Sequence, residues 1–108
     1  MDSEQLLSLL ERMKDAIPQF AQAKANRVYI EQFRKSLKAE LMQQSDGKTI
    51  ADRENYAYAH PRMLELVQGL RDAVEIEEKH KWALERIKMD VEVWRTLNAN
   101  EWQMKGNV

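Results

Sequence analysis

The clearest pattern in the chain is a repeat of alternating three- and four-residue steps in its second half. It begins after Pro61 and meets no helix breaker except Gly69 before Asn98. Residues at this spacing form the seam of a coiled coil, along which one helix packs against another. The pattern predicts one long helix over residues 62–99. Its expected seam consists of Leu70, Ala73, Glu77, His80, Leu84, Ile87, Val91, Trp94 and Asn98.

The first half of the chain predicts two helices, over residues 3–16 and 19–45. Asp2 and Gln5 have the spacing of a capping box at the start of the first. Pro18 lacks an N–H donor and disfavours helical angles in the residue before it, so it is expected to end or kink that helix. The stripe of the first helix is Leu6, Leu10, Met13 and Ile17, and that of the second is Phe20, Ala23, Ile30, Phe33, Leu37 and Leu41.

A turn and a short helix are predicted between the two long helices. Residues 45–48 are rich in turn formers, and Gly47 suits the left-handed conformation that follows many helix ends. Thr49, followed by Asp at the third position after it, can cap a short helix over residues 50–59. Pro61 then fits the first turn of the last helix, where its missing N–H costs nothing.

Composition agrees with an all-α fold in a single domain spanning residues 1–108. Hydrophobic residues make up 44% of the chain, and only three Gly and two Pro are present. The most frequent residues are strong helix formers. Because helices as long as these rarely stand alone, we expect an antiparallel, coiled-coil-like hairpin of the two long helices. A short amino-terminal helix and a short helix before Pro61 would flank it.

Charge is unevenly distributed between the two long predicted helices. Residues 24–38 carry five cations against one carboxylate, Glu31, whereas residues 65–78 carry five acids against one cation, Arg71. An antiparallel hairpin that turns near Gly47 would bring these flanks together. Exposed ion pairs contribute only about 0.2–1 kcal/mol each, so they select the register more than they hold the fold.

A second apolar stripe lies opposite the seam of the last helix and includes Trp82, Met89 and Val93. One neighbouring helix cannot cover two opposite stripes. Either the amino-terminal helix covers the second stripe within the same chain, or a second copy or partner protein does. Tryptophan and methionine are typical of interface centres, which favours a homodimer. The candidate interface residues are Trp82, Met89, Val93, Arg95 and Trp102.

Glu77 and His80 place two polar side chains in the middle of the expected seam. A Glu-x-x-His pair can bind a metal in a helical bundle when other helices supply further carboxylates, and Glu31 and Glu40 are weak candidates for that task. His80 could also act as a pH-sensitive contact. The favoured interpretation is a polar layer that fixes register or oligomeric state, with no metal and no cofactor.

The basic stretch offers a nucleic-acid hypothesis. Its candidate residues are Lys24, Arg27, Arg34, Lys35 and Lys38. Cations interleaved with Tyr29 and Phe33 could contact phosphates and stack on bases. However, Phe33 shares the apolar stripe of its helix and is therefore expected in the core. The formal net charge of −1 gives no overall basic field either. A solvated basic flank is the favoured interpretation.

Enzymatic activity is not expected. The chain contains no cysteine and no Gly-rich phosphate loop, and its serines lack any local motif of an activated nucleophile. The two histidines of the chain are weak candidates for general acid–base catalysis. The amino terminus starts with acids and mixes charge into its apolar residues, unlike a secretory signal. No stretch approaches the about 18 apolar residues of a membrane span, so we expect a cytoplasmic protein without membrane contact.

Residues 46–98 resemble a family of small, uncharacterised helical proteins of tailed bacteriophages and prophages. The matching features are Gly47-x-Thr49, Asp52-Arg53-Glu54, Ala57, Ala59 and Glu92-Val93-Trp94-Arg95. The resemblance implies that Thr49 and Asp52 cap a helix, that Arg53, Glu54 and Arg95 point outward, and that Trp94 lies on the seam. Relatives tend to end in a more basic tail. Here residues 98–102 intervene, which weakens a nucleic-acid role for the carboxyl end.

Three functional hypotheses follow. The first is a non-enzymatic, phage-encoded protein-interaction module, and the resemblance implies that it is an accessory of phage DNA recombination or replication in the bacterial cytoplasm. The second is direct nucleic-acid binding through the basic face of residues 24–38. The third is an inhibitor of a host defence complex, to which no particular residue points.

Overall fold

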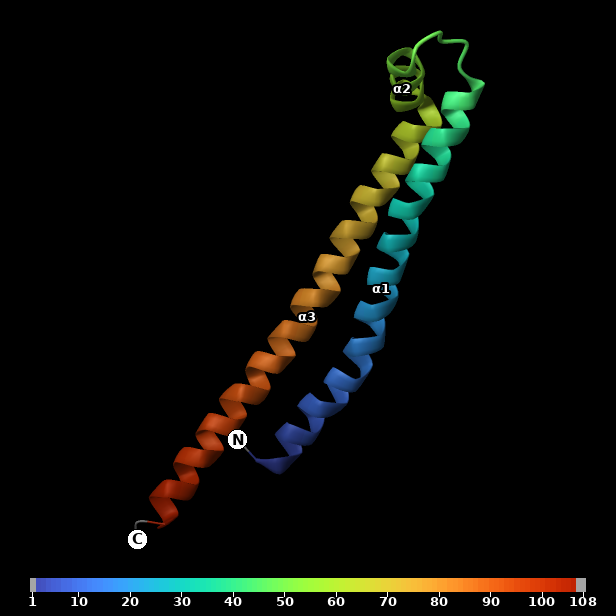
Figure 1. The fold of residues 1–108 in the computed structure, drawn as a ribbon. Helices are drawn as coiled ribbons and strands as arrows, with labels where there is room; N and C mark the ends of the chain where they lie inside the picture. Colours follow the sequence, from blue (N-terminus) through green and yellow to red (C-terminus); the bar gives the residue numbers. More distant parts are fainter. Residues whose placement is uncertain (1, 107–108) are drawn as a thin grey trace. The chain divides into compact units, whose positions relative to one another are not determined.

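A computed structural model describes residues 2–106 and shows an all-α protein. Among these residues there are three helices and no strand: α1 (Ser3–Gln44), α2 (Ile50–Ala59) and α3 (Pro61–Gly106) (Figure 1). The prediction of an all-helical chain is confirmed. The bounds of α2 match the expected helix over 50–59, and α3 starts at the proline expected in its first turn.

The helix end predicted at Pro18 is absent, because Pro18 lies inside the single helix α1. The separate helices over 3–16 and 19–45 were therefore wrong. The physical reason is a seam of alternating three- and four-residue steps that passes Pro18 without a change of phase. Packing on both sides of the proline can offset its lost hydrogen bond. The buried and half-buried seam residues are Leu6, Leu9, Met13, Ala16, Phe20, Ala23, Arg27, Ile30, Leu37 and Leu41.

This seam contains five of the six residues expected in the second stripe of α1, but it differs from the first stripe at two positions. Leu10 and Ile17 were expected to face the core, yet they are 44% and 50% exposed, whereas Leu9 is buried. Phe33 was likewise expected in the core and is 43% exposed. The amino-terminal leucines occupy several adjacent positions, so more than one apolar stripe can be drawn through them. At Leu10 and Ile17, the stripe predicted for the first helix was displaced by one residue from the stripe that the structure buries.

The seam predicted on α3 is confirmed by burial. All nine of its residues are buried or half-buried, with Ala73, Leu84 and Ile87 the most enclosed. Gly69 does not interrupt the helix. The helix continues to Gly106, beyond the expected end near residue 99.

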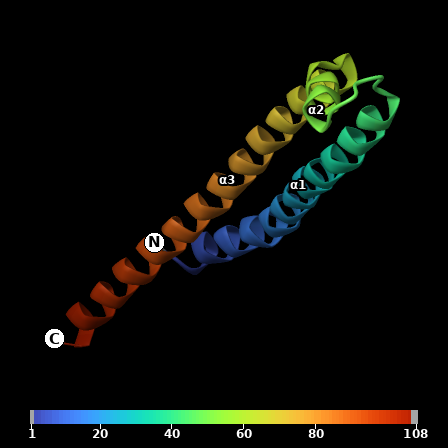
Figure 2. The same ribbon diagram turned by 45° about the horizontal axis from the view of Figure 1, so that its top comes forward.

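The chain forms two compact units, and α1 and α3 contribute to both. In the unit of residues 23–77, α2 lies at the end where α1 finishes and α3 begins (Figures 1 and 2). Its Ala57 is fully buried against both long helices. The core cluster of this unit is Leu37, Leu41, Ala57 and Met63, with Met42 and Leu66 packed against it.

The other unit combines the residues up to Gln22 with those from Glu78 onward. Its enclosed apolar residues are Leu9 from α1 and Leu84 and Ile87 from α3. Trp94 Nε1 donates a hydrogen bond of 2.9 Å to the carbonyl oxygen of Asp2, which ties α3 to the start of the chain. Trp94 is thus a packing residue, as the resemblance implied.

The predicted caps are present. Asp2 N donates to Gln5 Oε1 and Gln5 N donates to Asp2 Oδ1, both at 2.9 Å, which is a reciprocal capping box. Thr49 Oγ1 accepts a hydrogen bond of 3.1 Å from Asp52 N. Gly47 does not adopt the left-handed conformation expected from the sequence, because its φ is not positive. It is close-packed instead: a Cβ at this position would lie 2.8 Å from Asp52 Cβ.

Replacing Pro18 with alanine is expected to stabilise the protein. Alanine restores an N–H donor in the interior of α1, where proline costs up to about 3 kcal/mol. Urea unfolding followed by circular dichroism measures the gain. Pro61→Ala is the matched control, since a proline in the first helical turn is tolerated and its replacement should change little. Equal responses at the two sites would contradict a continuous α1.

Substitution by alanine should change the free energy of unfolding in opposite directions at Gly69 and at Gly47. Gly69→Ala should raise the free energy of unfolding by about 1 kcal/mol, because glycine is a poor helix former and a Cβ there meets no atom within 4 Å. Gly47→Ala should lower it, because the added Cβ collides with Asp52. Thermal and urea unfolding of the two variants would test this difference, and stabilisation by Gly47→Ala would refute the close packing.

Candidate functional site

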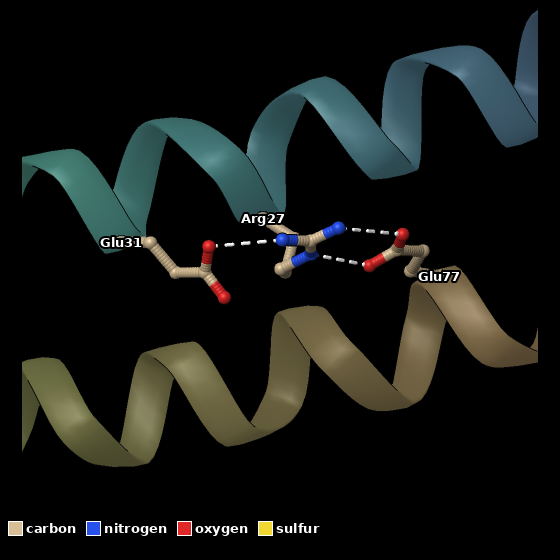
Figure 3. Close-up of polar contacts among 3 residues, drawn as sticks. All are labelled: Arg27, Glu31 and Glu77. Carbon is tan, nitrogen blue, oxygen red and sulfur yellow. Dashed lines mark hydrogen bonds and ion pairs between the residues drawn. The ribbon is translucent and has the colours of Figure 1, made fainter.

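An arginine inside the α1 seam is held by two carboxylates (Figure 3). Arg27 Nε donates to Glu77 Oε2 at 2.6 Å, and Arg27 Nη2 donates to Glu77 Oε1 at 3.1 Å. A third guanidinium nitrogen, Nη1, donates to Glu31 Oε2 at 2.9 Å. Glu77 lies on α3 and Glu31 lies one turn further along α1. The fork-like contact with Glu77 therefore joins the two long helices.

The cluster is partly enclosed, which strengthens its electrostatics. The side chains of Arg27 and Glu77 are 23% and 13% exposed, whereas that of Glu31 is 43% exposed. Hydrogen bonding to Glu77, and then to Glu31, raises the pKa of Arg27 above its already high ordinary value. The guanidinium is thus charged at any physiological pH. The pair works as a fixed polar layer within a mostly apolar seam.

The polar layer clarifies the role of Glu77, which the sequence placed beside His80. Glu77 is engaged with Arg27, and His80 is half-buried one turn further along α3. In the described part of the chain, no group of three or more His, Cys, Asp or Glu side chains is arranged to hold a metal ion. Arg27 was named as a nucleic-acid candidate, and its membership of the seam was missed. The repeat that crosses Pro18 would have shown it.

The five cations suggested for nucleic-acid binding do not share one environment. Arg27 forms ion pairs with two carboxylates, whereas Lys24 is exposed on α1. Arg34, Lys35 and Lys38 instead line one open cleft of about 480 Å³. The other residues around this cleft are Glu31, Gln32, Tyr58 and Leu70. Nucleic-acid contact through these cations remains a prediction.

Lys38 is positioned by α2 on one side of this cleft. Its Nζ lies 4.9 Å from the centre of the Tyr58 ring and 3.7 Å from Glu54 Oε1. Hydrogen bonding to the Tyr58 hydroxyl is the largest cause that raises the pKa of Lys38 above its ordinary value, and Glu54 adds to this effect. Arg34 and Lys35 make no ion pair with any residue between 2 and 106.

The second stripe of α3 is exposed. Trp82, Met89 and Val93 are 61%, 58% and 52% exposed. Leu97 continues the same face of the helix. The alternative in which the amino-terminal helix covers this stripe is therefore wrong, because α1 directs its own seam elsewhere. The Trp82 ring is oriented by neighbours on α3: its Nε1 donates to Glu78 Oε2 at 3.0 Å.

The carboxyl-terminal candidates are exposed as well. Trp102 is 74% exposed, so the structure does not use it to close a core. Arg95 points away from the seam, and its Nη1 lies 3.3 Å from Glu92 Oε1. These residues remain candidates for an interface, whereas Trp94 belongs to the packed face of α3.

An apolar groove in the unit of residues 23–77 was not anticipated from the sequence. It has a volume of about 340 Å³. The Tyr29 and Phe33 rings stack along it with their centroids 6.4 Å apart. Gly69 forms part of its wall, and a glycine inside a long predicted helix was the signal that the sequence offered. The remaining lining residues are Ile30, Leu37, Arg62, Glu65 and Leu66.

Comparisons of the chain with protein-family models, with curated proteins and with solved structures find no match. The site is therefore defined by its geometry alone. None of the helices that the structure describes has the length and apolar character required to span a membrane.

Replacing the two carboxylates of the polar layer separately should have unequal effects. Glu77→Gln should destabilise the fold more than Glu31→Gln, because Glu77 is less exposed and accepts two of the three hydrogen bonds from Arg27. Urea denaturation midpoints of the two variants measure this difference. A larger loss at Glu31 would show that the contact between helices is not the dominant one.

Proposed function

We propose that the protein is a non-enzymatic interaction module that assembles as a homodimer through the exposed apolar stripe of α3. The stripe is defined as Trp82, Met89, Val93 and Leu97. The observation that carries this proposal is the exposure of large apolar side chains along one face of a helix whose opposite face is already packed. Contiguous exposed apolar surface of this kind is typical of interaction sites.

The chemistry of the stripe supports an interface. Tryptophan and methionine are enriched at interface centres, where each can bury a large apolar area. Trp82 is further oriented by its hydrogen bond to Glu78 and by Lys81, whose Nζ lies 5.5 Å from the ring centre. A side chain that is held in place before binding loses less entropy when a partner arrives.

The charges beside the stripe favour a second copy of this chain as its partner. At about 100° per residue, the acids Glu78, Glu85 and Glu92 lie on one side of the Trp82–Met89 line. The cations Lys79 and Arg86 lie on the other side. When two such helices pack in parallel, the side of each that carries the three glutamates meets the side of the other that carries Lys79 and Arg86. Parallel α3 helices are therefore the proposed arrangement.

Within each chain, we propose that α1 and α3 form the antiparallel, coiled-coil-like hairpin expected from the charge pattern. Two contacts support it. Arg27 pairs with Glu77, and Glu40, later in α1, pairs with Arg62, earlier in α3, at 3.2 Å. The hairpin would use the seams of both helices and leave the stripe free for the dimer.

The cellular role is proposed from the resemblance to phage and prophage proteins. In this account the dimer is a cytoplasmic accessory of phage DNA recombination or replication and acts by contacting a phage or host protein. Trp102 and Arg95, which are not part of the stripe and are well exposed, are the candidate contacts for that partner. Affinity capture from infected cells would identify it.

Trp82→Glu is expected to dissociate the dimer. The substitution places a carboxylate at the first position of the stripe, where burial without a partner is unfavourable. Sedimentation velocity on the purified protein should give twice the mass of one chain for the parent and a single-chain mass for the variant.

Leu7→Glu is the matched control, because Leu7 is 64% exposed and lies on α1. It should leave the mass unchanged. Circular dichroism should show that both variants remain helical. A parent protein that sediments as a single chain at high concentration would contradict the proposed dimer, as would a Trp82→Glu variant that stays dimeric.

A further inference from the structure

Two arginines occupy equivalent seam positions of α1, seven residues apart. The seam that runs through Phe20, Ala23, Arg27 and Ile30 continues to the position of Arg34 before it reaches Leu37. Arg27 is held by two carboxylates and is half-buried. Arg34 occupies the same position of the repeat one heptad later, yet it is exposed.

Around Arg34, the two positions equivalent to the carboxylates that serve Arg27 carry no acid. Four residues after Arg27 stands Glu31, whereas four residues after Arg34 stands another cation, Lys38. Seven residues before Glu77 on α3 stands Leu70, and Leu70 lines the same cleft as Arg34. An apolar and a basic side chain thus replace the two acids, and the guanidinium of Arg34 has no anionic partner among the described residues.

We propose that the cleft around Arg34 binds a phosphoryl group. The cleft has a volume of about 480 Å³, and the cations Arg34, Lys35 and Lys38 are among its lining residues. Gln32 and Tyr58 add an amide and a hydroxyl that can donate hydrogen bonds. Leu70 contributes to the lining from α3. Glu31, the one carboxylate in the lining, is already committed to Arg27.

Phosphate fits this cleft better than a carboxylate does. A phosphate monoester carries a charge of about −1.5 to −2 at pH 7 and three strong acceptor oxygens. A carboxylate carries a single charge and two oxygens. Arginine can bind two phosphate oxygens at once, and the two lysines supply point charges beside it. Lys38 is already held near Tyr58 and Glu54, so part of the site is formed before the ligand binds.

This inference does not depend on the proposed dimer. The cleft belongs to the unit of residues 23–77, whereas the stripe belongs to the part of α3 after Glu78. The phosphoryl group can come from a small phosphate compound or from the backbone of a nucleic-acid strand, which share the chemistry that Arg34 recognises.

Titrations of the full chain with pyrophosphate and with a single-stranded thymidine oligonucleotide test the inference. Calorimetry follows the first probe and fluorescence polarisation the second. Arg34→Gln should weaken binding by about tenfold or more, since a hydrogen bond to a charged group is lost. Leu70→Glu should abolish it, because the new carboxylate would stand opposite Arg34 as Glu77 stands opposite Arg27. Lys24→Gln should have no effect, because Lys24 is exposed outside the cleft.

The two probes identify the source of the phosphoryl group. Binding of pyrophosphate that responds to Arg34→Gln and Leu70→Glu supports a small phosphate ligand. Binding of the oligonucleotide alone, with the same response and a steep dependence on salt, supports a nucleic-acid strand. Circular dichroism establishes that the Leu70→Glu variant is folded, and Arg34→Gln gives an independent readout if it is not. Absence of binding to both probes, or binding that neither substitution in the cleft reduces, overturns the proposal.

Discussion

A guanidinium held by two carboxylates interrupts the apolar seam between α1 and α3, and it limits which residues of the two helices can face each other. Apolar seam positions are largely interchangeable, so a one-heptad slip would cost them little. Such a slip would separate Arg27 from Glu77 and leave both charges in a partly enclosed place. Removing charge from water without a partner is expensive. The pair thus supplies specificity of register to a seam whose stability comes mainly from apolar burial.

The same repeat explains where the remaining surfaces lie. Each long helix uses one face for the seam. Apolar and charged side chains on its other faces therefore contact either a different partner or solvent. On α3 the unpaired face carries Trp82 and Met89, which is the basis for the proposed dimer. On α1 the repeat reaches Arg34, for which α3 offers Leu70 where Arg27 has Glu77. The exposed stripe of α3 and the cleft around Arg34, for which a dimer and a phosphoryl ligand are proposed, thus both follow from one heptad pattern.

Much of the fold could be predicted from the sequence, because its signals were local. The seam of α3, the capping box at Asp2 and the cap at Thr49 each depend on residues within a few turns of one another. The errors arose where a local rule competed with packing. Proline usually interrupts a helix, but at Pro18 the continuous seam of α1 prevails. Arg27 was assigned to a solvated basic flank because residue type outweighed its position in the repeat. Periodicity could place Trp82 opposite the seam, but it could not say what covers it.

The most direct test of this account is a charge reversal across the seam. Arg27→Glu and Glu77→Arg each place like charges together and should each lower the urea midpoint. The double variant restores an opposite pair between the helices, so it should be more stable than the sum of the two single losses predicts. The account predicts this positive coupling. Strictly additive losses would show that Arg27 and Glu77 do not meet in the folded protein, and the register of the seam would then have to be abandoned.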